Sequence, residues 1–112
     1  MIHVTIHRSK EGFIRSFTMK GHADFAEHGK DIVCAGASAV SFGAVNAIKA
    51  LANVDMNVEQ SEEGGFLHVQ VPDQVDTNSF EKIQLLLEGM LVSLQTIERG
   101  YGKFIRIVTK KD

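Results

Sequence analysis

Cysteine is almost absent from this sequence, since Cys34 is the only one among 112 residues. A single cysteine cannot form an intramolecular disulfide bond, which excludes the small secreted domains that are held together by disulfides. A free thiol is most stable in a reducing compartment. The sequence therefore predicts a cytoplasmic protein.

An excess of charge of either sign is also missing. Twelve Lys and Arg residues against fourteen Asp and Glu residues give a formal net charge of −2. Proteins that bind nucleic acid over a broad surface usually carry an excess of positive charge. The composition therefore predicts no direct contact with nucleic acid.

Long hydrophobic runs are absent as well. The longest uncharged stretch, residues 32–48, contains Gly, Ser and Asn and falls short of the roughly 20 apolar residues that a membrane-spanning helix needs. Residues 2–7 alternate apolar with polar side chains, which is typical of a strand and unlike the continuous apolar region of a signal peptide. We expect no membrane segment.

The composition is that of an ordinary folded domain, with 44% hydrophobic and 23% charged residues. The length suits one hydrophobic core, and no linker rich in Pro, Gly or Ser divides the chain. The sequence therefore predicts a single domain over residues 1–112.

Hydrophobic periodicity predicts the element order ββαββαβ. Apolar residues alternate in five segments, near residues 2–8, 13–20, 54–58, 67–71 and 103–110, and recur at helical spacing in two, near residues 32–52 and 77–100. This pattern is typical of an α+β fold, with one mixed or antiparallel sheet and two helices packed on it. Residues 21–31 show no sustained period and are expected to form a loop.

The first predicted helix carries an apolar stripe with spacings of three and four residues. Its members are Val33, Ala37, Val40, Ala44, Ile48 and Leu51. Asp31 precedes the stripe and is a plausible N-cap, which places Cys34 in the first helical turn.

The loop and the start of this helix combine residues suited to thiol chemistry. A thiolate is favoured at a helix N-terminus or beside a cationic imidazole, so the helix start and His22 could both activate Cys34. Ser38 lies one turn beyond Cys34 on the same face and could hydrogen-bond near the sulfur. Asp31 could orient the imidazole, although capping is its favoured role.

Local sequence leaves other interpretations open. A lone cysteine in an Ala-rich helix is often a small buried hydrophobe. His22, His28 and Cys34, with or without Asp31, could instead hold a metal ion, but their spacing matches no compact zinc pattern. We therefore predict no metal site.

The stretch from residue 21 to residue 40, GHADFAEHGKDIVCAGASAV, resembles the signature of the ribosomal-processing cysteine protease (Prp) family. The resemblance implies a cytoplasmic endopeptidase, typically a homodimer, that removes an N-terminal extension from a ribosomal protein of the large subunit. It also implies that Cys34 is the nucleophile and His22 the general base. Asp31 and Ser38 match motif positions with less settled roles.

By the same analogy, the loop between Ala23 and Lys30, which includes His28 and Gly29, moves to admit the peptide. The expected chemistry is acyl transfer, with N–H groups at the helix start stabilising the oxyanion and no cofactor required. The alternative is a non-catalytic module that binds a ribosomal protein or rRNA and needs Cys34 only for packing.

Two further sets of side chains bear on surfaces and pockets. Phe25 and Phe42 are candidate pocket residues, with core packing favoured for Phe42. His3, His7 and His68 occupy strand positions that alternate with apolar residues, so we expect them on the solvent face of the sheet.

Overall fold

The computed structural model of the chain describes residues 1–21 and 28–112, and it describes residues 28–31 by their backbone alone. Within these ranges the predicted order ββαββαβ is confirmed. The elements are β1 (Ile2–Arg8), β2 (Ile14–Lys20), α1 (His28–Ala52), β3 (Asn57–Gln60), β4 (Phe66–Gln70), α2 (Thr77–Tyr101) and β5 (Ile105–Lys111).

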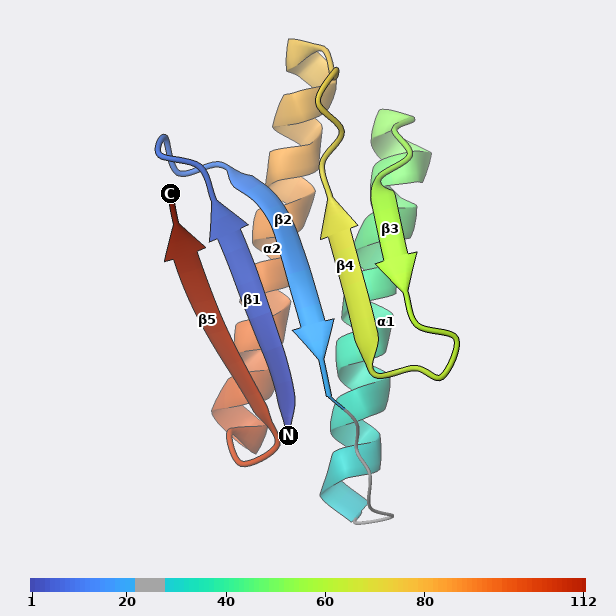
Figure 1. Cartoon of the computed structure of the whole chain (residues 1–112), viewed down its shortest axis with the longest axis vertical. Coiled ribbons are helices and arrows are strands. Elements are labelled where there is room, and N and C mark those ends of the chain that lie inside the picture. The colour runs from blue at the N-terminus through green and yellow to red at the C-terminus, as the bar shows by residue number, and fades with distance from the viewer. Residues whose placement is uncertain (22–27) are drawn as a thin grey trace.

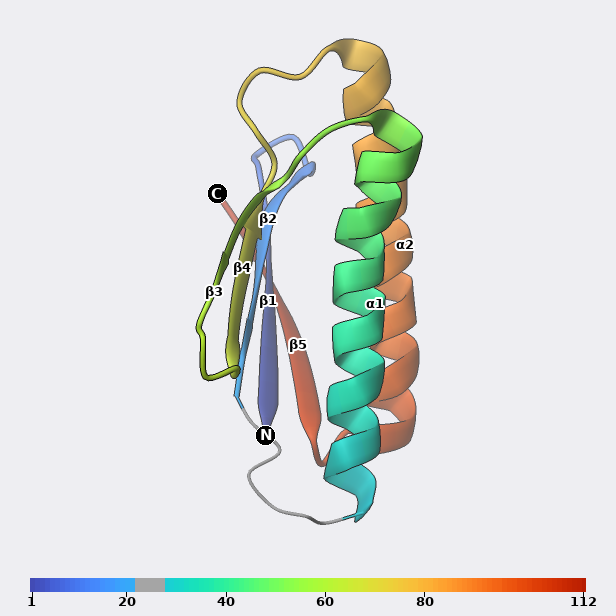
Figure 2. The same cartoon turned by 90° about the vertical axis from the view of Figure 1, so that its right-hand side faces the viewer.

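The strands form one sheet in the order β3-β4-β2-β1-β5 (Figure 1). The β1–β5 pair is parallel, whereas the other neighbours are antiparallel, so the sheet is mixed. Both helices lie against the same face of the sheet and leave the opposite face uncovered (Figure 2). This confirms the α+β prediction, with two layers that bury one apolar face of each element.

The core forms where the inward residues of the central strands meet the helices. Val4 is paired with Met19 and Ile6 with Phe17 across β1 and β2, and all four side chains are buried. The register shifts at His7/Arg8, which is an irregularity of the β-bulge type.

The register shift overturns one expectation about the second strand. The apolar alternation near residues 13–20 places Phe13 on the buried face with Phe17, but Phe13 is 46% exposed, whereas Ile14 is fully buried. A bulge adds a residue to one strand and so reverses the alternation beyond it. Gln84 of α2 binds both the N–H and the carbonyl of Ile14, each at 2.8 Å, and thereby satisfies the main chain at this end of β2.

The inner face of α1 follows the predicted stripe over most of its length, since Val33, Ala37, Ala44 and Ile48 are buried. The prediction is wrong for Leu51, which is 62% exposed. The buried face continues instead to Ala52, four residues after Ile48, as helical geometry allows.

By length and composition alone, the stretch Ile32–Ala52 of α1 could cross a membrane, with a hydropathy of 1.5. The core helix of a soluble protein passes the same test. Gly36 of α1 approaches α2 so closely that a Cβ there would lie 3.6 Å from the Ile97 side chain. The predicted packing of the helix is therefore confirmed, and the absence of a membrane span stays a prediction.

The second helix begins at a clear N-cap. The carboxylate of Asp76 accepts a hydrogen bond from the N–H of Ser79 at 2.7 Å. This contact holds the pKa of Asp76 below its usual value, because it stabilises the charged form. Asp76 is therefore the N-cap of α2. The third strand differs from its prediction near residues 54–58, because β3 begins only at Asn57. Val58 belongs to the predicted apolar alternation, but it is 41% exposed, since β3 is an edge strand.

Candidate active site

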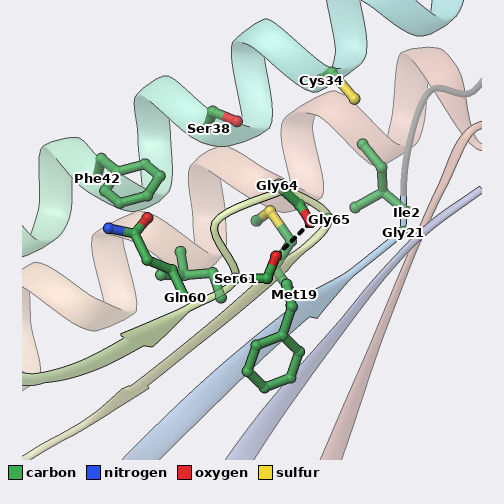
Figure 3. A pocket seen from close by; sticks show the side chains of 12 residues that line it. Ile2, Met19, Gly21, Cys34, Ser38, Phe42, Gln60, Ser61, Gly64 and Gly65 are labelled. Carbon is green, nitrogen blue, oxygen red and sulfur yellow. Dashed lines mark hydrogen bonds between the residues drawn. The ribbon is translucent and has the colours of Figure 1, made fainter.

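Cys34 is half-buried and lines a cavity of about 170 Å³ between α1 and one end of the sheet (Figure 3). The wall contributed by α1 comprises Cys34, Ser38 and Phe42, which are spaced by four residues and therefore share a helix face. Ser38 therefore lies on the same cavity wall as Cys34. Cys34 is thus accessible from a hollow instead of being enclosed in the core.

Phe42 corrects an expectation. Core packing was favoured for this residue, but its side chain lines the cavity and is 37% exposed. It follows Ser38 by one helical turn, so its ring lies on the cavity face and not on the face that carries Ala37 and Ala44 into the core. An aromatic wall gives the cavity an apolar surface on which a substrate side chain can pack.

The wall opposite α1 comes from the end of β3 and the turn into β4. It contains Gln60, Ser61, Gly64 and Gly65 (Figure 3). Both glycines have a positive φ, of 81° and 80°, and the Ser61 hydroxyl donates a hydrogen bond to the Gly64 carbonyl. Because the glycines have no side chains, main chain faces the cavity here, and a peptide backbone can approach closely.

Sequence reasoning missed this wall. In the sequence, the stretch QSEEGG at residues 60–65 indicates only a turn between two strands. The signal that could have found it is the pair Gly64 and Gly65, since adjacent glycines mark a site where another backbone comes near. Sequence alone does not show which helix that turn faces.

Gly21, the residue after β2, also lines the cavity. Its φ is 116°, and a Cβ at this position would lie 2.2 Å from the carbonyl oxygen of Met1. Its N–H donates to the carbonyl of Gly65 at 2.9 Å. The residue that immediately precedes His22 is therefore held in one place, on the same cavity as Cys34.

Several predicted site residues fall outside the described part of the chain. His22, Ala23 and Phe25 lie in the gap between residues 21 and 28, and the side chains of His28 and Asp31 are likewise outside the description. Among the candidates, the structure brings together Cys34 and Ser38. The roles predicted for His22 and Asp31 stay predictions.

The start of α1 corrects three expectations. The helix begins at His28, so His28 and Gly29 belong to its backbone and not to a loop. Asp31 lies inside the helix and cannot be its N-cap. Cys34 is the seventh helical residue and falls in the second turn, because the helix continues one turn further towards the N-terminus than the apolar stripe indicated.

This longer helix changes the expected electrostatics. At 1.5 Å per residue, Cys34 lies about 9 Å along the axis from His28. The influence of a helix end falls off within the first turn, and the unpaired N–H groups belong to that turn. The helix start is therefore not the source of the N–H groups that were expected to stabilise an oxyanion at Cys34.

The metal interpretation gains no support from the described residues. Among them, no group of three His, Cys, Asp or Glu side chains is placed to hold a metal ion. The candidate ligands His22 and His28 lie outside the side chains that the structure describes. The half-buried thiol of Cys34 lies in an apolar cleft, with main chain on the opposite wall. This geometry suits covalent attack of the sulfur on a bound peptide.

Comparison with known proteins identifies the family. A family model described as cysteine protease Prp matches residues 1–106. The ribosomal processing cysteine protease Prp of Bacillus subtilis is 50% identical over 109 residues, which cover 97% of each chain.

Two solved structures extend the comparison to the fold. The ribosomal processing protease Prp from S. aureus in complex with a substrate peptide has a TM-score of 0.86 and 47% identity, over 98% of this chain and 100% of that chain. Its complex with a covalently linked product peptide has a TM-score of 0.84 and 45% identity, over the same shares of the two chains. The resemblance in the sequence is thus confirmed, and the chain belongs to the Prp family of cysteine proteases.

Proposed function

We propose that this cysteine endopeptidase removes an N-terminal extension from a ribosomal protein of the large subunit, with Cys34 as nucleophile and His22 as general base. The observation that carries the proposal is the position of Cys34. Cys34 lines the same cavity as Gly21, the residue before His22. The relatives described as ribosomal processing proteases, one of them with a substrate peptide, support the choice of substrate.

The proposed chemistry is acyl transfer. The Cys34 thiolate attacks the scissile carbonyl carbon, and the carbonyl oxygen becomes an oxyanion. The C–N bond then breaks as the His22 imidazolium donates its proton to the departing amine. His22 next takes a proton from water, the resulting hydroxide attacks the thioester, and cleavage of the C–S bond returns Cys34 to its thiolate form.

The substrate is expected to lie in an extended form between α1 and the glycine turn. Main chain at Gly64 and Gly65 faces the cavity from one side, and the Ser38 hydroxyl faces it from the other. Next to the cavity, β3 is an edge strand whose residues are all exposed, so its free main-chain groups can pair with a peptide. Ser38 then donates a hydrogen bond to the bound peptide or to the oxyanion.

We also propose a homodimer in the cytoplasm. The family resemblance favours this state, and two apolar side chains support it. Leu85 and Val92 of α2 are 74% and 60% exposed, and their spacing of seven residues places them on one helix face. Burial of this face against a second copy would remove it from water. Sedimentation should therefore show a dimer for the native chain and a monomer for the variant with Leu85→Glu and Val92→Glu.

The test of the catalytic proposal is cleavage of the N-terminally extended ribosomal protein, followed by intact mass. One cut near the substrate N-terminus is the expected result. Stable binding of the substrate without any cleavage would favour the non-catalytic binding module instead. Alkylation of Cys34 as a function of pH, in the native chain and in His22→Ala, measures whether the imidazole activates the thiol.

A further inference from the structure

The sheet face opposite the helices carries a row of polar and aromatic side chains, of which only Phe66 belongs to a residue that also borders the cavity at Cys34. Strand register places His3 beside both Lys20 and Arg106, and Lys20 beside Phe66. These residues alternate with the buried ones on their strands, so the row faces away from the helices, on the side that Figure 2 shows uncovered. It therefore combines an aromatic ring, an imidazole and two permanent cations.

The contact within this row is direct. The ammonium nitrogen of Lys20 lies 5.9 Å from the centroid of the Phe66 ring. At this separation a cation is attracted to the face of the ring, and a planar base can take the place of the cation on the same face. Phe66 is part-buried, so its ring is held by the sheet and yet open to a ligand.

A second row crosses the same face closer to the other end of the strands. His7 is paired with both Ser16 and Lys110, and Ser16 is paired with Gln70. An open depression of about 500 Å³ lies here, lined by His7, Arg15, Ser16, His68, Gln70 and Asp112. The Nδ1 of His68 lies 2.8 Å from the hydroxyl of Thr18, which fixes that imidazole on the surface.

Charge on this face differs from that of the whole chain. Its cations are Lys20, Arg106, Lys110 and Arg15. The carboxylates on or beside this face are Glu59, paired with His68, and Asp112, with exposed Asp73 at 3.8 Å from Arg15. The chain as a whole has a net charge of −2. The carboxylates lie beside the other cations, whereas the row of His3, Lys20, Arg106 and Phe66 contains none, so the positive charge of this face is concentrated in that row.

We propose that this face binds single-stranded RNA, with the cations on phosphates and Phe66 stacked on a base. Five strands spaced by about 4.8 Å give a surface about 19 Å wide, which accommodates several nucleotides. Aromatic rings and imidazoles on a sheet can stack on unpaired bases, which favours RNA as the ligand. An acidic peptide would interact with the cations alone and would make no use of the Phe66 ring. This contact would hold the peptidase on an RNA-containing substrate particle while leaving the cleft at Cys34 free.

The test is fluorescence anisotropy with a short labelled oligouridine. The variant with Arg106→Glu and Lys110→Glu should bind about tenfold more weakly or worse, because it removes two phosphate contacts. The matched control carries Lys82→Glu and Arg99→Glu on α2, with the same change in net charge, and should bind like the native chain. With about three phosphate contacts, the logarithm of affinity should fall with the logarithm of salt at a slope of about −2.

A second variant tests stacking apart from charge. Phe66→Leu should weaken oligouridine about fivefold or more while keeping the salt slope. The proposal would be overturned if the two charge-reversed variants lost the same amount of RNA affinity. It would also be overturned if polyglutamate bound as tightly as the RNA and its affinity were unaffected by Phe66→Leu. Cleavage of a free substrate peptide by the variant with Arg106→Glu and Lys110→Glu should remain native, which separates this inference from the proposed peptidase function.

Discussion

The N–H of Gly21 donates a hydrogen bond to the carbonyl of Gly65 at 2.9 Å, and both residues line the cleft that contains Cys34. Gly21 ends β2, and Gly65 belongs to the turn that leads into β4. The bond thus ties the residue before His22 to the wall opposite α1. A shift at either glycine would change the cavity and the direction in which the chain leaves β2.

Gly21→Ala should therefore impair folding and cleavage together. The φ of 116° disfavours any L side chain, and the added Cβ would lie 2.2 Å from the Met1 carbonyl oxygen. We expect a loss of about 1–2 kcal/mol from the backbone and about 1–3 kcal/mol from the clash, read from urea unfolding. Cleavage of the substrate by the folded fraction should also fall.

Gly12→Ala is the matched control for this substitution. Gly12 also has a positive φ, of 98°, but a Cβ there would meet nothing within 4 Å. Gly12→Ala should lower the free energy of unfolding only by the backbone contribution, about 1–2 kcal/mol, and should leave the cleavage rate unchanged. Equal losses at both glycines would show that the contact between Gly21 and Met1 has no importance.

Phe42→Ala should weaken substrate binding. Phe42 lines the cavity one turn beyond Ser38, and its removal takes away apolar contact from a bound peptide. We expect kcat/KM to fall about tenfold, mainly through KM, which corresponds to about 1.4 kcal/mol of lost contact. The control is Phe13→Ala, since Phe13 is 46% exposed and packs edge-to-face on Phe80 outside the cavity. An unchanged KM in Phe42→Ala would remove this residue from the binding surface.

Ser38→Ala should lower kcat more than it raises KM. The hydroxyl lies on the cavity face of α1, one turn from Cys34, where a donor can assist the transition state. A fall of about fivefold to tenfold in kcat is expected from the loss of one hydrogen bond. Ser93→Ala on the exposed side of α2 is the control and should be silent. An unchanged kcat in Ser38→Ala would show that the Ser38 hydroxyl does not assist the transition state.

Stability should depend on the ion pair between Arg8 and Glu88. The guanidinium contacts both carboxylate oxygens, at 2.6 and 2.9 Å, and this hydrogen bonding holds the pKa of Glu88 below its usual value. A carboxylate whose pKa is lowered by folding stabilises the protein above its unfolded pKa of about 4.3. That stability is lost as the pH falls through the lowered value in the folded state.

Glu88→Gln should therefore lower the free energy of unfolding by about 0.5–1 kcal/mol at neutral pH and by less in acid. The modest size reflects the solvent screening of Glu88, whose side chain is 45% exposed. Asp55→Asn removes a more exposed pair with Lys49 and should have a smaller effect. A loss in Glu88→Gln that grows on acidification would contradict the account.

The sequence predicts the elements well because their apolar periods are long and their turns are marked. The hydrophobic pattern alone indicates the helix Thr77–Tyr101, and Asp76 before it is a typical N-cap residue. The pattern also indicates which residues of β1 face the core. It does not indicate the β-bulge at His7/Arg8, because the alternation of Phe13 and Phe17 looks regular until the partner strand is known. Register is a tertiary property that local periodicity does not contain.

The site is predicted in part for the same reason. Cys34 and Ser38 are apparent from spacing on one helix, whereas Gly64 and Gly65 come from a distant hairpin that only the fold brings to the cavity. The start of α1 was placed too late, since His28 to Asp31 continue the helix without apolar residues on its inner face. Helix ends defined by polar residues leave no hydrophobic signal.

The most direct test of the account is a cleavage assay by intact mass, with the N-terminally extended ribosomal protein and either the native chain or Cys34→Ala. The account predicts one cut near the substrate N-terminus with the native chain and a loss of at least about a thousandfold in the variant, whose fold is retained. Because Cys34 is half-buried at a cavity, the variant should unfold near the native urea concentration. Substantial cleavage by the folded Cys34→Ala protein would contradict the assignment of Cys34 as the nucleophile.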